Sequence, residues 1–177
     1  MIDAHRALAE RVAARIRDIP DFPKPWILFK DITPVLLDPR LFGDAIAFMG
    51  DDWGPVDRIV GMESRGFIFG AALVERLSAG LVLARKKGKL PFATVAVAYG
   101  LEYGSDTLEM HTDAIAPGDR VLVVDDLLAT GGTAHATIEL ARNAGGIVVG
   151  ATFLVELGFL DGRARLDVPV RSLLTVG

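Results

Sequence analysis

Cysteine is absent from this sequence, and no long apolar run occurs in it. The lack of cysteine excludes disulfides, thiolate catalysis and cysteine-ligated metals. No segment approaches the roughly 18 apolar residues of a membrane span, and the first twenty residues lack a stretch of signal-peptide length. We therefore expect a cytoplasmic protein that has no membrane partner.

Neither sign of charge is in large excess, because the formal net charge is only −4. This weak acidity argues against a nucleic-acid partner. The three histidines, His5, His111 and His135, lack a metal-binding spacing, so we assign them no chemistry. A chain of 177 residues can bury roughly 70% of its unfolded surface. We expect one domain over residues 1–177.

Hydrophobic periodicity indicates alternating strands and helices, which predicts an α/β fold with a mainly parallel central sheet flanked by helices. A segment rich in proline, residues 20–34, is expected to be extended and turning. Residues 86–108 are expected to form a loop or a projecting hairpin. The expected helices are 4–19, 41–49, 66–77 and 133–144, and the expected strands are 58–62, 81–85, 94–99, 121–124 and 147–157.

The stretch VLVVDDLLATGGT places two aspartates, Asp125 and Asp126, after an apolar strand and before a glycine loop at 127–132. Ligands of open α/β sheets bind at the carboxyl ends of strands. Free N–H groups at a helix start favour an anion, and Gly131 and Gly132 allow its close approach. A 5-phosphorylated sugar suits this pattern, with its phosphate on the loop amides and its ribose hydroxyls donating to the carboxylates.

Other interpretations of this stretch stay open. The aspartates could form a metal pocket, as in a phospho-receiver domain, although that interpretation does not use TGGT. They could also be solvated charges. The stretch is not a P-loop, because no G-x-x-x-x-G-K-[ST] occurs. Thr130 and Thr133 can supply hydroxyl donors, and one of them can cap the helix.

The stretch resembles the phosphoribosyl-pyrophosphate (PRPP) motif of type I phosphoribosyltransferases, and DDLLATGGT is similar to the adenine-specific members. Four further segments agree in order, namely PDFPKPWILFKDITPVL, GMESRGFIFG, RKKGKLP and LEYG. The resemblance covers about residues 4–174. It implies a type I phosphoribosyltransferase-like fold, transfer of phosphoribose from PRPP to adenine, Mg²⁺ as cofactor and a homodimer.

The resemblance also implies roles for individual residues. Arg65, in SRGF, would grip pyrophosphate with its guanidinium fork. The hood loop at 86–108 would close over PRPP, and its Glu102 would exchange a proton with the purine. The implied catalytic residues are Glu102, Arg65, Asp125 and Asp126. The implied PRPP contacts are Arg65, Lys86, Lys89, Tyr103, Asp125, Asp126, Ala129, Thr130, Gly131, Gly132 and Thr133.

The segment PWILFKD resembles an adenine-binding segment within residues 1–35. Phe29 would stack on the base, the Leu28 backbone would read its amidine edge, and Lys30 completes the implied set. Trp26 departs from the glycine expected in many relatives. Two alternatives stay open, a phosphoribosyltransferase for a 6-oxopurine and a non-catalytic regulator that senses PRPP or purine.

Overall fold

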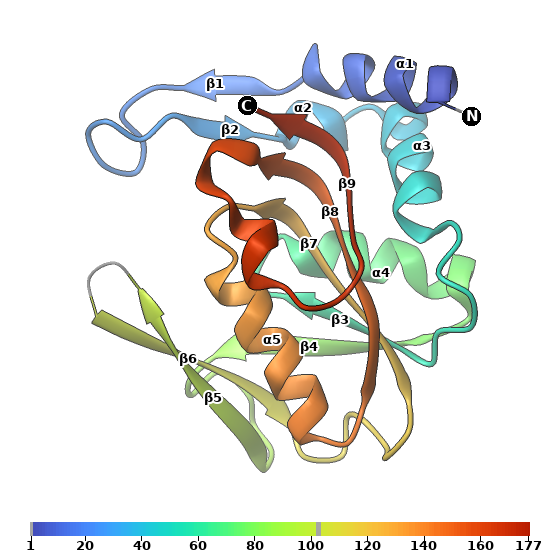
Figure 1. Ribbon diagram of the computed structural model, residues 1–177, viewed down its shortest axis with the longest axis vertical. Coiled ribbons are helices and arrows are strands. Elements are labelled where there is room, and N and C mark those ends of the chain that lie inside the picture. The colour runs from blue at the N-terminus through green and yellow to red at the C-terminus, as the bar shows by residue number, and fades with distance from the viewer. Residues whose placement is uncertain (1, 102–103) are drawn as a thin grey trace. The chain divides into compact units, whose positions relative to one another are not determined.

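The computed structural model describes residues 2–101 and 104–177 (Figure 1). The chain divides into two compact units, Met1–Phe48 and Met49–Gly177, which are described separately. Among the described residues, every helix is too short or too polar to cross a bilayer. The expectation of a single domain over the whole chain stays a prediction.

The first unit corrects the helix predicted at residues 4–19. Helix α1 ends at Ala13, and Arg17–Ile19 forms a strand antiparallel to Phe29–Asp31. Two ion pairs join these strands, Arg17 to Asp31 and Lys30 to Asp18, each at 2.6 Å. Pairing across the strands therefore replaces the last turns of the predicted helix. The elements are α1 Ile2–Ala13, β1 Arg17–Ile19, β2 Phe29–Asp31, α2 Thr33–Leu36 and α3 Pro39–Gly50, whose last two residues fall in the second unit.

A seven-stranded sheet organises the second unit, with the order β5-β6-β4-β3-β7-β8-β9. Strands β4, β3, β7, β8 and β9 are mutually parallel, and β5 and β6 are antiparallel, which confirms the predicted mainly parallel sheet. The sequence did not predict β9 or the two short 3₁₀ helices. The elements are β3 Arg58–Met62, α4 Gly66–Leu77, β4 Gly80–Lys86, β5 Thr94–Leu101, β6 Gly104–His111, β7 Arg120–Leu128, α5 Gly132–Asn143, β8 Ile147–Leu157, η1 Gly158–Leu160, η2 Gly162–Arg165 and β9 Val170–Val176.

Helices α4 and α5 cover opposite faces of this sheet (Figure 1). Side chains alternate between the two faces along a strand. Val60 of β3 belongs to a core cluster with Leu140 of α5. Its neighbour Gly61 lies instead against the start of α4, where a methyl group added to Gly61 would lie 3.0 Å from the carbonyl oxygen of Gly66. The central strands are therefore covered on both faces, which explains their continuous apolar runs.

Strands β5 and β6 form a hairpin at one edge of the sheet, as Figure 1 shows in olive and yellow. Strand β6 pairs with β5 along its length and with β4 near Arg85 and Lys86. Most of the hairpin lies within the region for which a loop or projecting hairpin was expected. Its strands extend to His111, three residues beyond the expected limit.

Candidate phosphoribosyl-binding site

The two aspartates lie inside strand β7, which corrects their predicted place after its end. The strand continues to Leu128, because it keeps pairing with β8 from Asp125 opposite Phe153 to Leu128 opposite Glu156. The following loop is correspondingly short and spans 129–131 instead of the predicted 127–132. The carboxylates are therefore held on rigid strand backbone, next to the carboxyl end of the sheet.

Burial makes this aspartate pair electrostatically unfavourable. Asp126 is only 3% exposed, and its Oδ2 lies 3.0 Å from Arg65 Nε. The Asp126 N–H donates to Asp125 Oδ1 at 2.8 Å. Burial raises the pKa of Asp125, and the charge of Asp126 raises it further. Burial also raises the pKa of Asp126, although Arg65 opposes that rise.

The loop that joins β7 to α5 surrounds a small cavity. Residues 127–134, with Met62 and Asp125, line a space of about 90 Å³. The space has room for a small group such as a phosphate. The predicted threonine cap is wrong, because Gly131 is the residue before the helix, with φ of +80° and no side-chain cap. Only glycine adopts that backbone readily.

A second segment supports this loop from outside. A methyl group added at Gly162 would collide with the carbonyl oxygen of Ala129, and one added at Gly131 would collide with the carbonyl oxygen of Gly162. Arg163 fixes the supporting segment by donating to Glu156 at 3.0 Å and to the carbonyl oxygen of Val170 at 2.7 Å. The loop backbone is thus packed against a second, anchored backbone.

Arg65 stands where β3 ends and α4 begins, as its position in SRGF predicts. Arg65 directly precedes Gly66, the first residue of α4. The peptide bond between Glu63 and Ser64 is cis. Gly66 packs directly on β7, since an added methyl group would meet Val124 O and Asp125. This close approach brings Arg65 to Asp126, so two segments that lie sixty residues apart form one site.

The predicted cations of the basic cluster pair with carboxylates of the same chain. Lys86 Nζ lies 3.0 Å from Asp106 Oδ2, and Lys89 Nζ lies 3.3 Å from Glu63 Oε1. The hydrogen bond and charge of Asp106 raise the pKa of Lys86, and Lys86 in turn lowers the pKa of Asp106. Lys86 and Lys89 are both exposed.

The hairpin brings a tyrosine to the first turn of α5. The Tyr99 hydroxyl donates to Asp106 Oδ2 at 3.4 Å. Burial raises the pKa of Tyr99, while a hydrogen bond from the Thr133 side chain opposes the rise. Thr130 is exposed, and Thr133 and Gly132 are half-buried. The predicted residues Glu102 and Tyr103 lie outside the described residues.

The predicted base-binding residues belong to the first unit. Phe29 begins strand β2 and meets the ring of Phe22 edge-on, with centroids 5.1 Å apart. Lys30 pairs with Asp18, and Leu28 precedes the strand with half of its surface exposed. Trp26, which departs from the family pattern, is 97% exposed with φ of +71°.

Comparisons with known proteins agree with this geometry. Residues 41–171 match the phosphoribosyl transferase domain family. The adenine phosphoribosyltransferase of Acidothermus cellulolyticus is 55% identical over 172 residues, which cover 96% of this chain and 97% of that protein. This chain belongs to the adenine phosphoribosyltransferase family.

Solved structures of the adenine phosphoribosyltransferase family share the fold. The enzyme of Rhodothermus marinus is 54% identical, with a TM-score of 0.94 over 97% of this chain and 99% of that one. The enzyme of Saccharomyces cerevisiae is 39% identical, with a TM-score of 0.89 over 96% of this chain and 99% of that one. That structure is a complex with adenine and an imino-altritol 1,6-bisphosphate. The predicted type I phosphoribosyltransferase-like fold is thereby confirmed.

Three residues that shape this site were not predicted from the sequence. Glu63 and Asp106 pair with the basic cluster, and Gly162 packs on the phosphate loop. Glu63 offered a signal, because a carboxylate directly before an expected anion-binding turn is an unfavourable neighbour that needs a cation. Asp106 and Gly162 offered none, because their partners are distant in sequence.

Proposed function

We propose that this protein transfers the 5-phosphoribosyl group of PRPP to adenine and releases AMP and pyrophosphate. The bond from C1 of the ribose to diphosphate breaks, a bond from C1 to N9 of adenine forms, and the N9 proton leaves. The observation that carries this proposal is the small cavity beside the half-buried Asp125 and the buried Asp126, in a chain of this family. The complex of the yeast relative with adenine supports the choice of base.

The loop from Ala129 to Thr133 holds the 5-phosphate in this proposal. The N–H groups of Thr130, Gly131 and Gly132 and the Thr133 hydroxyl are the donors that its anionic oxygens need. The start of α5 adds a favourable dipole. Because the phosphate is remote from the reacting carbon, its binding energy aligns C1 with the base.

Asp125 and Asp126 accept hydrogen bonds from the ribose hydroxyls. Their pKa values are raised because burial removes both carboxylates from water and the charge of Asp126 lies next to Asp125. Such a pair gains from any positive charge that develops nearby, and a ribosyl group that loses diphosphate develops that charge. The pair therefore stabilises the transition state more than the ground state.

The departing diphosphate is held by Arg65, Lys86 and Lys89. A guanidinium at a strand end offers a rigid fork to phosphate oxygens, and the two ammonium groups lie on exposed, movable side chains. Lys86 pairs with Asp106 and Lys89 pairs with Glu63. Arg65 thereby contacts the reacting group and the ribose-binding Asp126.

Mg²⁺ is the proposed cofactor, and the residues present fit it. No cluster of three or more His, Asp or Glu ligands occurs among residues 2–101 and 104–177. Mg²⁺ usually binds one or two carboxylates together with substrate phosphates. Asp125 and Asp126 can provide the carboxylates, and PRPP provides the phosphates. A cation there would oppose both the burial and the charge of Asp126 that raise the pKa of Asp125. When bound, it supplies neutralisation of the diphosphate charge.

Adenine is bound by Leu28, Phe29 and Lys30 in this proposal, and Glu102 takes the N9 proton. The Leu28 backbone offers an N–H donor and a carbonyl acceptor, the polarity that matches adenine and opposes a 6-oxopurine. Residues 86–108, including Tyr103, act as a hood that excludes water from the ribosyl cation.

Assembly and location complete the proposal. We expect a homodimer in the cytoplasm, with a single phosphoribosyltransferase domain over residues 1–177. An exposed basic loop in an otherwise acidic chain suits contact with an anionic ligand held by a second copy. Light scattering of the purified protein tests the dimer, and a monomer at micromolar concentration would contradict it.

A purine panel tests the activity directly. The purified protein is given Mg²⁺ and PRPP with adenine, hypoxanthine, guanine or xanthine, and nucleotide and pyrophosphate are quantified. We expect AMP and equimolar pyrophosphate from adenine, and turnover at least about a hundredfold lower with the 6-oxopurines. Preferred turnover of a 6-oxopurine would assign another base, and binding of PRPP without turnover of any base would indicate a regulator.

A further inference from the structure

Glu63 connects two loops that the proposed function assigns to diphosphate. It directly precedes the Ser64–Arg65 turn, and its carboxylate reaches the basic loop at residues 85–89. Its side chain is only 12% exposed. A carboxylate this close to an anion-binding turn opposes binding electrostatically, so its presence requires another explanation.

The carboxylate of Glu63 accepts from backbone as well as from side chains. The N–H of Lys86 donates to Glu63 Oε2 at 3.0 Å, and Lys89 Nζ donates to Oε1 at 3.3 Å. Arg85 Nε lies 3.4 Å from Oε2, close enough for an ion pair but outside hydrogen-bond geometry. Although burial opposes the shift, these partners hold the pKa of Glu63 below its usual value, the Lys86 N–H most strongly.

The rest of the basic loop is fixed by backbone contacts, and its lysine side chains stay exposed to solvent. The Gly88 N–H donates to the buried carboxylate of Glu109 at 2.9 Å, and the Lys87 N–H donates to Thr107 O at 3.0 Å. Arg85 Nη1 donates to Lys89 O at 2.9 Å and closes the turn. The Glu63 carboxylate adds a tie from this turn to the Arg65 side of the site, beyond the backbone bond from the Glu63 N–H to Ala84 O at 2.9 Å.

We propose that Glu63 is a positioning residue for the diphosphate of PRPP, which holds the basic loop at residues 85–89 against the Ser64–Arg65 turn. The inference rests on the proposed function, because it takes diphosphate as the shared ligand of the two loops. Glu63 does not contact the ligand. It places Lys86 and Lys89 by fixing the backbone that carries them, and this gain outweighs the unfavourable charge.

Asp106 provides a matched control for the charge. Its carboxylate also lies beside the basic loop, but it meets only the Lys86 side chain there, through Nζ at 3.0 Å. Asp106→Asn and Glu63→Gln each remove one negative charge near the diphosphate, which by itself favours an anion. Only Glu63→Gln also weakens the hold on the Lys86 backbone. A difference between the two variants therefore reports on positioning.

The test measures the reverse reaction, in which AMP and magnesium pyrophosphate give adenine and PRPP. For Glu63→Gln we expect the KM for pyrophosphate to rise about tenfold, the loss expected when an N–H loses a charged acceptor. The KM for AMP, which carries no diphosphate, should stay within about twofold. For Asp106→Asn we expect the KM for pyrophosphate to stay unchanged or to fall.

Three outcomes would overturn the inference. Glu63→Gln could leave the pyrophosphate KM unchanged or lower it, as a mere counter-charge would. It could raise both KM values alike, as general disruption would, or Asp106→Asn could raise the pyrophosphate KM equally. If Glu63→Gln does not fold, Glu63→Asp carries the test, with a several-fold rise for pyrophosphate alone. A wild-type protein that makes neither AMP nor PRPP would instead refute the proposed function.

Discussion

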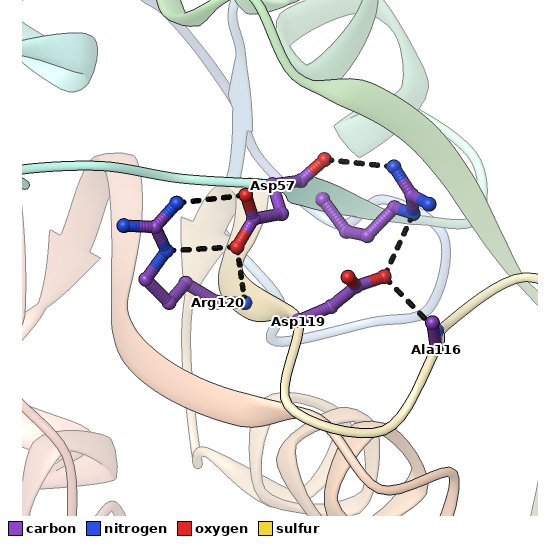
Figure 2. Close-up of polar contacts among 5 residues, drawn as sticks. Asp57, Ala116, Asp119 and Arg120 are labelled. Atoms are coloured by element: carbon purple, nitrogen blue, oxygen red, sulfur yellow. Dashed lines mark hydrogen bonds and ion pairs between the residues drawn. The ribbon is translucent and has the colours of Figure 1, made fainter.

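Aspartate and arginine side chains gather at both ends of the neighbouring strands β3 and β7, in different proportions. The amino-end cluster contains Asp57, Arg58, Asp119 and Arg120, with one cation for each carboxylate (Figure 2). The carboxyl-end cluster contains Arg65, Asp125 and Asp126, with one cation for two carboxylates. The paired strands β3 and β7 thus carry two clusters that differ in their ratio of cations to carboxylates.

Every carboxylate of the amino-end cluster meets a matched donor. Arg120 Nε and Nη2 donate to the two oxygens of Asp57 at 2.8 Å each, and Arg58 Nε lies 3.1 Å from Asp119 Oδ2. The Ala116 N–H also donates to Asp119, as Figure 2 shows. The hydrogen bonds from Arg120 hold the pKa of Asp57 far below its usual value. This cluster stabilises the fold and leaves no demand for a ligand.

The carboxyl-end cluster differs in burial and in the direction of its pKa shifts. The Asp126 side chain is 5% exposed, against 34% for Asp57. Burial raises the pKa of Asp125 and of Asp126, the opposite of the shift at Asp57. Desolvated carboxylates without enough cations destabilise a protein, so they are typical of sites that receive charge from a ligand. The carboxyl-end cluster therefore has the burial and charge expected of the proposed ligand site, and the amino-end cluster has those of a structural cluster.

Removal of both carboxylates at the carboxyl end should have the largest effect. We expect Asp125→Asn with Asp126→Asn to lower kcat/KM for PRPP by about a thousandfold or more, because the ribose contacts and the electrostatic stabilisation are lost together. Steady-state kinetics measure this change, and near-normal turnover would refute the ribose role. The fold should survive, since asparagine has the same shape.

The same double variant should be no less stable than the wild type. A carboxylate with a raised folded-state pKa gives its stabilising contribution below the unfolded pKa and loses it as pH rises through the folded pKa. The advantage of the variant should therefore grow as pH rises from acid to neutral. Chemical denaturation across that range measures it, and an advantage that shrinks with rising pH would contradict the burial argument.

Arg65→Lys should have the next largest effect. Lysine keeps the charge but not the planar fork, so we expect kcat/KM for PRPP to fall about ten- to a hundredfold. Arg58→Lys is the matched control at the other end of the same strand and should leave kcat/KM within about twofold. Equal losses in the two variants would mean that the clusters do not differ in function.

The sequence predicted the elements that local pattern determines. The bounds of β3, α4 and β8 agree with the expected ranges, because each is a periodic or continuous apolar run that ends at polar or glycine residues. The helix predicted at residues 4–19 is wrong after Ala13. The residues of β1 satisfy helical spacing, but they pair with β2 through ion pairs whose partners lie at least twelve residues away. A single sequence does not display such partners.

The site shows the same limit. The glycine loop, both aspartates and Arg65 follow from short motifs, and their meeting follows from the parallel sheet. Asp106 and Gly162 act through contacts with residues 20 and about 31 positions away, so no local pattern marks them, whereas only the place of Glu63 before the expected anion-binding turn gave a signal. The charge balance that distinguishes the two clusters likewise depends on burial, which the sequence does not give.

Asp57→Asn should destabilise the protein without changing its kinetics. Arg120 loses a charged bidentate partner, so we expect Tm at pH 7 to fall by a few degrees while kcat/KM stays within about twofold. Because the folded-state pKa of Asp57 is lowered, its stabilising contribution exists above the unfolded value of about 3.9. The difference between wild type and variant should therefore shrink as pH falls below that value. A difference that persists in strong acid would assign the effect to packing.

Asp119→Asn should have the smallest effect within the same cluster. Arg58 and Asp119 meet through a single contact at 3.1 Å, and Arg58 also donates to the Asp57 carbonyl oxygen at 3.1 Å. Asparagine keeps an oxygen that can accept from the Ala116 N–H. A partly exposed pair of this kind contributes about 0.5 kcal/mol or less, and salt screens it. Denaturant unfolding at low and high salt should show a small loss that vanishes in high salt. A loss as large as that of Asp57→Asn would mean that the four residues act as one network and not as two separate pairs.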